Sequence, residues 1–265
     1  MLRIISLEDI ELNVYDAGEG DPIVFVHGFP LDHTMWMAQL EEFSQTHRVI
    51  APDLRGFGQS EDSPGIVPME QFADDLSGIL SQLHVTMPVT LCGLSMGGYI
   101  AWQFWKRHPQ QLRRLILCDT RAVEDSPEAK QNRQQTSEQV LNHGASQLAE
   151  TMPGKMFSLQ TNESQPELID QVKSTILRTS PMGISAALLG MAARPDVTSW
   201  LPQIRVPSLV IVGEDDTIST VQEMEAIAAA LPVAEFQVIP QAGHLSPLEQ
   251  PGIVNQTIHQ FLARH

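Results

Sequence analysis

The stretch Val89-Thr90-Leu91-Cys92-Gly93-Leu94-Ser95-Met96-Gly97-Gly98 decides how the rest of the chain is interpreted. It predicts a buried strand, a sharp turn at the serine and then a helix, because an apolar run stops at a serine flanked by small residues. A serine at the tip of such a turn has strained backbone, and large side chains two positions away would collide with the strand and the helix. We therefore take Ser95 as the candidate nucleophile. The alternative interpretation is that the glycines only let a helix pack closely on a sheet.

On both sides of this stretch, short apolar runs alternate with segments of helical periodicity. The expected strands are residues 23–26, 48–51, 112–118, 208–212 and 235–239, and the expected helices are 34–45, 72–83, 95–107, 219–231 and 247–263. An early antiparallel hairpin is expected around residues 10–22, where weak alternation ends in a turn-rich segment. This order predicts a mostly parallel sheet with helices on both faces, in which ligands collect at the carboxyl ends of the strands.

Residues 121–203 interrupt this rhythm, because Gln, Glu and Ala dominate there and the periodicity is helical. We expect a helical cap inserted into one core domain, which consists of residues 1–120 and 204–265. A chain of 265 residues is long enough for such a domain. The cap is expected to set substrate choice, with apolar side chains that either line the pocket or pack between cap helices. The candidates are Met156, Phe157, Met182 and Leu188.

A serine hydroxyl needs a base within hydrogen-bond reach and a third group that orients the base. His244 is the candidate base, since it follows the last expected strand in a loop at a carboxyl end. For seven other histidines we expect solvated or helix-capping roles. These are His33, His47, His84, His108, His143, His259 and His265.

Three aspartates at strand ends are candidates for the group that orients the base. Asp215 and Asp216 follow the expected strand 208–212, and Asp119 follows the expected strand 112–118. The alternative role for the adjacent pair is to cap the helix expected near residue 219.

Attack on a carbonyl carbon puts negative charge on oxygen, which preorganised backbone N–H groups must meet. Met96 follows the serine, and its N–H opens a helix, where the dipole favours anions. Phe29, in the loop after the expected strand 23–26, is expected to supply the second N–H. His27, in the same loop, is expected to have a structural role in holding it.

Five blocks of the sequence, in this order, resemble the signature blocks of the α/β-hydrolase superfamily. They are His27-Gly28-Phe29-Pro30, Asp53-Leu54-Arg55-Gly56-Phe57-Gly58-Gln59-Ser60, Gly93-Leu94-Ser95-Met96-Gly97-Gly98, Gly213-Glu214-Asp215-Asp216 and Gly243-His244. The resemblance covers nearly the whole chain and implies an α/β-hydrolase fold, with a mostly parallel eight-stranded sheet, flanking helices and a helical cap. The order Ser95, Asp216, His244 matches the triad order of that fold. The family's acid lies three residues after the glycine of the fourth block, which favours Asp216.

Within the superfamily, three segments resemble carboxylesterases and 3-oxoadipate enol-lactonase-like hydrolases: residues 93–99 around the serine, residues 117–121 and residues 193–196. The resemblance implies a serine hydrolase that cleaves a carboxylic ester or lactone through an acyl-enzyme, without a cofactor. Cofactor-free perhydrolases of the haloperoxidase type resemble the chain nearly as well. A non-catalytic ligand-binding protein on the same fold is the alternative from a different functional class. A carboxylated substrate would need a cation nearby, and the candidates are Arg121, Arg133, Arg178 and Arg194.

The composition limits the partners. Sixteen basic against 32 acidic residues give a net charge of −16, which argues against nucleic acid and anionic membranes as partners. Acidic residues interrupt the N-terminus before a signal-type apolar segment forms, and we expect a cytoplasmic protein whose Cys92 and Cys118 are free and buried. No sequence pattern indicates a metal site or an oligomeric state. The expected partner is a small-molecule ester or lactone.

Overall fold

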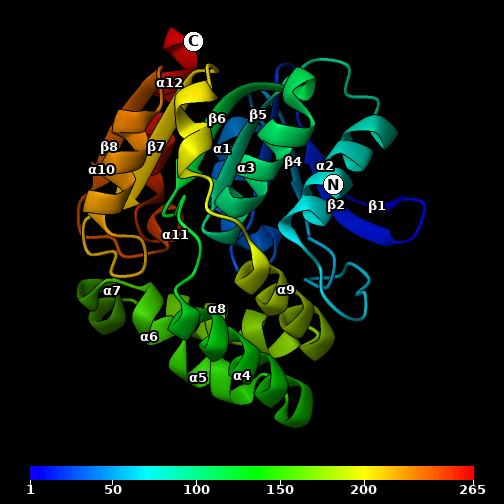
Figure 1. Ribbon diagram of the computed structural model, residues 1–265. Coiled ribbons are helices and arrows are strands. Elements are labelled where there is room, and N and C mark those ends of the chain that lie inside the picture. The colour runs from blue at the N-terminus through cyan, green and yellow to red at the C-terminus, as the bar shows by residue number, and fades with distance from the viewer.

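The apolar runs pair into one eight-stranded sheet in the computed structural model, which describes residues 1–265 (Figure 1). The strands are β1 (Leu2–Ser6), β2 (Glu11–Ala17), β3 (Pro22–Val26), β4 (Arg48–Pro52), β5 (Val89–Leu94), β6 (Leu112–Cys118), β7 (Ser208–Gly213) and β8 (Ala234–Ile239). They lie side by side in the order β1-β2-β4-β3-β5-β6-β7-β8. Only the β1–β2 and β2–β4 pairs are antiparallel. The predicted mostly parallel, eight-stranded sheet is therefore confirmed.

The predicted early hairpin contains a strand that the sequence analysis missed. β1 pairs with β2 from Leu2 opposite Tyr15 to Ser6 opposite Glu11, so the hairpin turn lies at residues 7–10 and not at the expected segment after β2. β1 forms one edge of the sheet, and its Leu2 and Ile4 side chains are exposed. A strand without a buried apolar face has little of the periodicity by which strands are identified in a sequence.

Helices cover both faces of the sheet (Figure 1). α2 (Met69–Gln82) packs against α3 (Met96–Arg107), while α10 (Val221–Ala230) packs on β7 and β8. On the opposite face α1 (Met37–Phe43) packs against α12 (Pro251–Arg264). The single helix expected over 247–263 is two, α11 (Ser246–Glu249) and α12, because Pro251 forces Gln250 out of helical backbone. Short 3-10 helices η1 (His33–Trp36) and η2 (Pro109–Gln111) precede α1 and β6.

Six helices form a separate layer below the carboxyl ends of the parallel strands (Figure 1). They are α4 (Pro127–His143), α5 (Ser146–Thr151), α6 (Pro153–Met156), α7 (Leu159–Ser164), α8 (Pro166–Arg178) and α9 (Pro181–Ala193). Four of them begin with proline at the first helical position. Proline is favoured there because an N–H at this position would have no acceptor within the helix. The 3-10 helix η3 (Thr198–Gln203) falls inside the expected cap but packs against α10 of the core. We therefore propose that the cap ends near residue 193.

One contiguous apolar core lies between the sheet and its helices and extends into the cap. Every residue of β3, β5 and β7 is buried, as expected for strands covered on both faces. Cys92 and Cys118 are buried and free, as predicted. No single helix is long and apolar enough to cross a bilayer, and only the bent pair α8 and α9, at 96° to each other, meets that length and composition together.

Candidate active site

Ser95 lies on the turn between β5 and α3. At this point of the sheet the strand order changes direction, since β4 was added on one side of β3 and β5 on the other. β3 has β4 on one side and β5 on the other, so the loops after β3 and β5 face a common crevice. The backbone of Ser95 has φ 54° and ψ −110°, a conformation that costs a non-glycine residue about 1–3 kcal/mol. The Ser95 N–H donates to Cys118 O at 3.0 Å, and the Thr120 hydroxyl donates to Ser95 O at 2.7 Å. Contacts with β6 and its loop therefore hold the strained turn.

The glycines around the serine are required by close backbone contacts. A Cβ atom on Gly93 would lie 2.4 Å from Gly97 O, and one on Gly97 would lie 2.3 Å from Val26 O. No side chain fits at either position without moving the strand or the helix. These contacts agree with the interpretation that the glycines permit close packing of the helix on the sheet. That interpretation does not account for the strained backbone of the serine between them.

The structure brings Ser95, His244 and Asp216 together, although they come from three separate loops. His244 Nε2 lies 2.8 Å from Ser95 Oγ, and His244 Nδ1 lies 2.9 Å from Asp216 Oδ2. In a neutral imidazole this arrangement places the hydrogen on Nδ1, which donates to the carboxylate, and leaves Nε2 to accept the serine proton. Both His244 and Asp216 are buried, whereas Ser95 is partly accessible.

The carboxylate of Asp216 is kept ionised by its surroundings. Its Oδ1 accepts the N–H groups of Ile218 at 2.7 Å and Ser219 at 3.1 Å, and its Oδ2 accepts the Ser219 hydroxyl at 2.6 Å. Burial by itself would raise the pKa of this carboxyl, but the nearby His244 and these hydrogen bonds outweigh it and hold the pKa below its usual value. A charged acceptor therefore faces the imidazole Nδ1–H.

The two other candidate aspartates do not reach the imidazole. Asp215 is exposed, and its N–H donates to Ala242 O at 2.8 Å. Asp119 is fully buried and links the neighbouring loops, accepting the Gly213 N–H at 2.8 Å and the Ser246 hydroxyl at 2.5 Å. Burial, together with the charge of Asp216, raises the pKa of Asp119 well above its usual value.

The expected capping role of the 215–216 pair is wrong. The helix after them, α10, is capped by Thr220, whose hydroxyl accepts the Glu223 N–H in a capping box. Asp216 instead accepts hydrogen bonds from the short turn that precedes this cap.

The backbone N–H groups of Phe29 and Met96 have no hydrogen-bond acceptor within the protein. Both residues are buried, and a Cβ atom on Gly28, which precedes Phe29, would lie 3.5 Å from Ser95 Cβ. Buried N–H groups are nearly always paired, so two free ones beside a serine hydroxyl indicate a place for an external oxygen. Met96 is the first residue of α3, which adds the dipole of the helix N-terminus.

His27 joins the loop after β3 to the loop after β4. Its Nε2 accepts the Leu54 N–H at 3.0 Å, and its Nδ1 lies 3.0 Å from Gly28 O. Burial lowers the pKa of this imidazole, so the neutral ring donates through Nδ1. The expected structural role of His27 agrees with these contacts.

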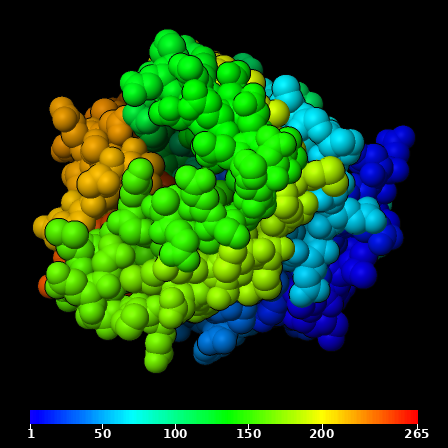
Figure 2. Space-filling view, turned by 90° about the horizontal axis from the view of Figure 1, so that it is seen from below, coloured from blue at the N-terminus to red at the C-terminus, as the bar shows by residue number.

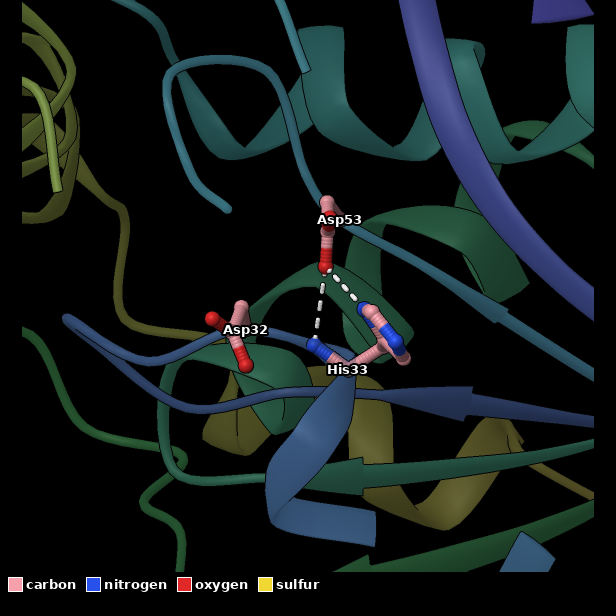
Figure 3. A group of neighbouring side chains, drawn as sticks. All are labelled: Asp32, His33 and Asp53. Atoms are coloured by element: carbon pink, nitrogen blue, oxygen red, sulfur yellow. Dashed lines mark hydrogen bonds and ion pairs between the residues drawn. The ribbon is translucent and has the colours of Figure 1, made fainter. Parts of the chain in front are cut away.

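A second supporting cluster, Asp32, His33 and Asp53, lies at the far end of the same loop (Figure 3). Asp53 Oδ1 accepts both the backbone N–H of His33 at 2.9 Å and its ring Nδ1 at 2.6 Å. Asp53 Oδ2 accepts Asn13 Nδ2 at 2.8 Å and the Gln59 N–H at 3.0 Å. Since the Asp53 carboxylate already accepts four hydrogen bonds, the cluster suits N–H donors and not a metal ion.

The expectation of a solvated or capping role for His33 is wrong. Its side chain is buried, and although burial lowers its pKa, the hydrogen bond and the charge of Asp53 outweigh that effect and raise it. The only sequence signal for this pair was the position of Asp53 in the second signature block, at the end of the strand beside β3.

The cap contacts the loops of the candidate site at several points. The hydroxyl of Thr179 donates to Pro30 O at 3.3 Å, next to Phe29, and the His244 N–H donates to Met156 O at 2.8 Å. On α9, a Cβ atom at Gly183 would lie only 1.9 Å from Gly56 O. Seen from below, the molecule shows a hollow bordered by residues of the cap (Figure 2).

The apolar candidates of the cap differ in their positions. Met156, Phe157 and Leu188 are buried, whereas 45% of Met182 is exposed at the start of α9. Met182 is therefore not a core residue between cap helices. Met156 takes part in the site through its backbone, since its carbonyl accepts the His244 N–H.

The candidate cations for a carboxylated substrate are mostly paired with acids of the protein. Arg121 lies 2.5 Å from Glu223, and Asp125 lies 2.5 Å from Arg133 and 2.8 Å from Arg194. The fourth candidate, Arg178, is 63% exposed at the end of α8, with Asp32 at 3.7 Å.

Comparisons with known proteins agree with this architecture. The family model of the alpha/beta hydrolase fold matches residues 21–251. A thermophilic esterase from Thermogutta terrifontis with malate bound is 47% identical, with a TM-score of 0.96, over 100% of this chain and 98% of the other. An enol-lactonase from Burkholderia xenovorans LB400 is 28% identical, with a TM-score of 0.92, over 98% of this chain and 100% of the other. The 3-oxoadipate enol-lactonase 2 of Acinetobacter baylyi is 26% identical over 98% of this chain and 96% of its own length.

Proposed function

The chain belongs to the alpha/beta hydrolase fold family, and we propose that it is a serine hydrolase that cleaves a carboxylic ester. The observation that carries this proposal is the continuous relay from Ser95 Oγ through His244 to Asp216, with distances of 2.8 Å and 2.9 Å. A binding protein needs no nucleophile with its base and acid, so a role in binding alone would leave this relay unexplained.

In the proposed reaction, Ser95 Oγ attacks the carbonyl carbon of the ester while His244 Nε2 accepts the hydroxyl proton. The carbonyl oxygen becomes negatively charged and accepts the free N–H groups of Phe29 and Met96; the loss of one such donor typically costs about 3 kcal/mol of barrier. The alkoxide leaves with the proton held by His244, and an acyl-enzyme forms.

Water completes the proposed cycle. It gives its proton to His244 Nε2 and attacks the acyl carbon, and the tetrahedral intermediate expels Ser95 Oγ, which regains a proton. Asp216 keeps the imidazole in the tautomer with Nδ1–H and stabilises its charged form in both steps. No step requires a cofactor.

The close pairing of three of the four candidate arginines favours an uncharged ester over a carboxylated lactone, since only Arg178 has no carboxylate nearer than 3.7 Å. Arg121, Arg133 and Arg194 each lie within 2.8 Å of a protein carboxylate. Binding of a substrate carboxylate by Arg121 would leave Glu223 without its ion pair, and binding by Arg133 or Arg194 would remove one of the two cations beside the buried Asp125. Esterases and enol-lactonases are both among the relatives, so we infer the ester from the charges and not from the relatives.

The proposal is tested by hydrolysis of 4-nitrophenyl esters of graded chain length by the wild-type protein and by Ser95→Ala. We expect turnover by the wild type and a loss of about 10⁴-fold or more in the variant.

Three outcomes would contradict the proposal. Unchanged turnover in Ser95→Ala would remove the serine from the mechanism. Absence of turnover with any ester or lactone would favour a binding protein. Peroxide-dependent halogenation that greatly exceeds ester hydrolysis would identify a perhydrolase, which uses the same three residues with hydrogen peroxide in place of water.

A further inference from the structure

Glu249 is a buried carboxylate at the end of α11 that the proposed reaction does not use. Its side chain is almost fully buried, with 4% of the residue exposed. Neither lysine, arginine nor histidine lies within ion-pair distance of it. Its two oxygens accept backbone N–H groups from two different parts of the molecule: Oε1 accepts Gly243 at 2.7 Å and Oε2 accepts Ser158 at 2.9 Å. Burying a carboxylate without a cation costs free energy of folding, which hydrogen bonds to backbone N–H groups only partly offset. A role for these two hydrogen bonds would explain why the carboxylate is there.

The two donors belong to segments that determine the geometry of the base. Gly243 immediately precedes His244, whereas Ser158 lies in the cap between α6 and α7. The segments also meet directly, since the His244 N–H donates to Met156 O at 2.8 Å. A Cβ atom on Gly243 would lie 2.6 Å from Ser158 N, so the two backbones are in contact. The loop that carries the base is therefore held by a segment of the cap.

We propose that Glu249 is a positioning residue that fastens residues 156–158 of the cap to the loop of His244, so that the base is in place only while this segment is seated. The inference rests on the proposed function, because it assigns a consequence to the position of His244. Proton transfer from Ser95 depends steeply on that position, since His244 Nε2 stands 2.8 Å from the hydroxyl and a displacement of about 1 Å typically costs about 10²-fold in rate. Glu249 itself touches neither the substrate nor the reacting atoms.

The test compares Glu249→Gln with Asp75→Asn, a matched loss of another buried carboxylate. Asp75 lies 2.7 Å from Arg55 and has no contact with the loop of His244. A glutamine amide accepts only one of the two N–H groups and turns a donor toward the other. We expect Glu249→Gln to lower kcat by about 10- to 100-fold with little change in KM, while Asp75→Asn lowers the unfolding temperature and leaves kcat near wild type.

A spectroscopic measurement separates positioning from a general loss of stability. The proton shared by His244 Nδ1 and Asp216 should give a low-field NMR resonance in the wild type and in Asp75→Asn, and this resonance should broaden or disappear in Glu249→Gln. Equal kcat and an unchanged resonance in Glu249→Gln, with only a lower unfolding temperature, would overturn the proposal. If Ser95→Ala keeps its turnover, the proposed function fails instead, whatever the Glu249 variant does.

Hydrogen exchange of the wild-type protein tests the same coupling without a variant that has to fold. If Glu249 fastens the two segments, the amide protons of Ser158, Gly243 and His244 open as one unit and exchange with the same protection. Exchange of Ser158 that is much faster than that of Gly243 and His244 would show that the cap segment leaves without disturbing the base, and would overturn the proposal.

Discussion

The core helix α3 and the outer cap helix α4 differ in how many of their residues are buried. In α3, which follows the nucleophile turn, nine of the 12 residues are buried, whereas in α4, the longest cap helix, two of the 17 are buried. A helix with so little buried surface adds little to the global stability and opens more readily. The difference does not hold for the whole cap, since α9, which lies against the core, has nine of its 13 residues buried. The cap is therefore well packed where it meets the core, and contacts of α9 and of residues 156–158 join it to the core loops.

Those contacts connect the cap to the loops that carry chemistry. Gly183 on α9 meets the loop after β4 at Gly56, and residues 156–158 meet the loop of His244 through Glu249. The cap is therefore attached at sites where small movements reach the reacting groups. The following variants test how far the two regions can be separated, beginning with the largest effect.

The strongest test compares two buried carboxylates at neighbouring strand ends, Asp216 and Asp119. Asp216→Asn should lower kcat by about 10⁴-fold, because an amide no longer favours the Nδ1–H tautomer of His244. Asp119→Asn should lower kcat by less than about tenfold, since Asp119 does not contact the imidazole and an amide can still accept from Gly213 and donate to Ser246. Steady-state kinetics on one ester measure both variants.

The pH dependence of stability gives an independent check on Asp119. Because its pKa is raised in the folded protein, its contribution to stability is fully present below the usual value of 3.8 and is lost as the pH rises through the raised pKa. Asp119→Asn should therefore be at least as stable as the wild type at about pH 8, by thermal unfolding. A lower unfolding temperature of the variant at this pH would contradict the assignment.

The attachment of the cap is tested by two glycines in cap helices. Gly183→Ala should destabilise the protein by about 1–3 kcal/mol or more, because its Cβ would stand 1.9 Å from Gly56 O and force α9 off the core. Gly154→Ala in α6 should be neutral or slightly stabilising, since no atom lies within 4 Å of its Cβ and alanine favours helix. Urea unfolding measures both, and limited proteolysis shows whether the cap is cut first.

Equal stabilities of these two variants would mean that α9 is not held at this contact. Faster proteolysis in the cap of Gly183→Ala, with an intact core, would support the view that the cap opens separately from the core.

The smallest effect is expected at the pair of His33 and Asp53, where His33 lies at the end of the loop that follows β3. The pKa of His33 is raised in the folded protein, so its contribution is fully present below its usual 6.5 and is lost as the pH rises through the raised value. The pKa of Asp53 is lowered, so its contribution is present above its usual 3.8 and is lost in acid. His33→Gln should therefore cost more stability at about pH 6 than at about pH 9, by thermal unfolding in matched buffers. A difference that grows with pH would show that the pair is not ionic.

Much of the fold was predictable because each strand of the core carries its own local signal. β3, β5, β6 and β7 are short apolar runs that end at turn residues, and the carboxyl ends of parallel strands meet at one edge. β1 was missed because its exposed residues lack a buried face, and the break before Pro251 was overlooked within a long helical pattern. In the cap, helical periodicity predicted helices but not which side chains would be buried, as Met182 shows.

The sequence by itself determined that Ser95 would stand on a strained turn, with His244 and a carboxylate on loops at the same edge, because neighbouring residues along the chain decide such turns. The resemblance to the family favoured Asp216 over Asp119, and the structure places Asp216 beside the imidazole. Only the tertiary structure decided that the arginines pair with acids and that His33 is buried. It alone placed Ser158 on Glu249, 91 positions along the chain. Contacts of this kind depend on how separate segments pack against each other, and no local pattern records them.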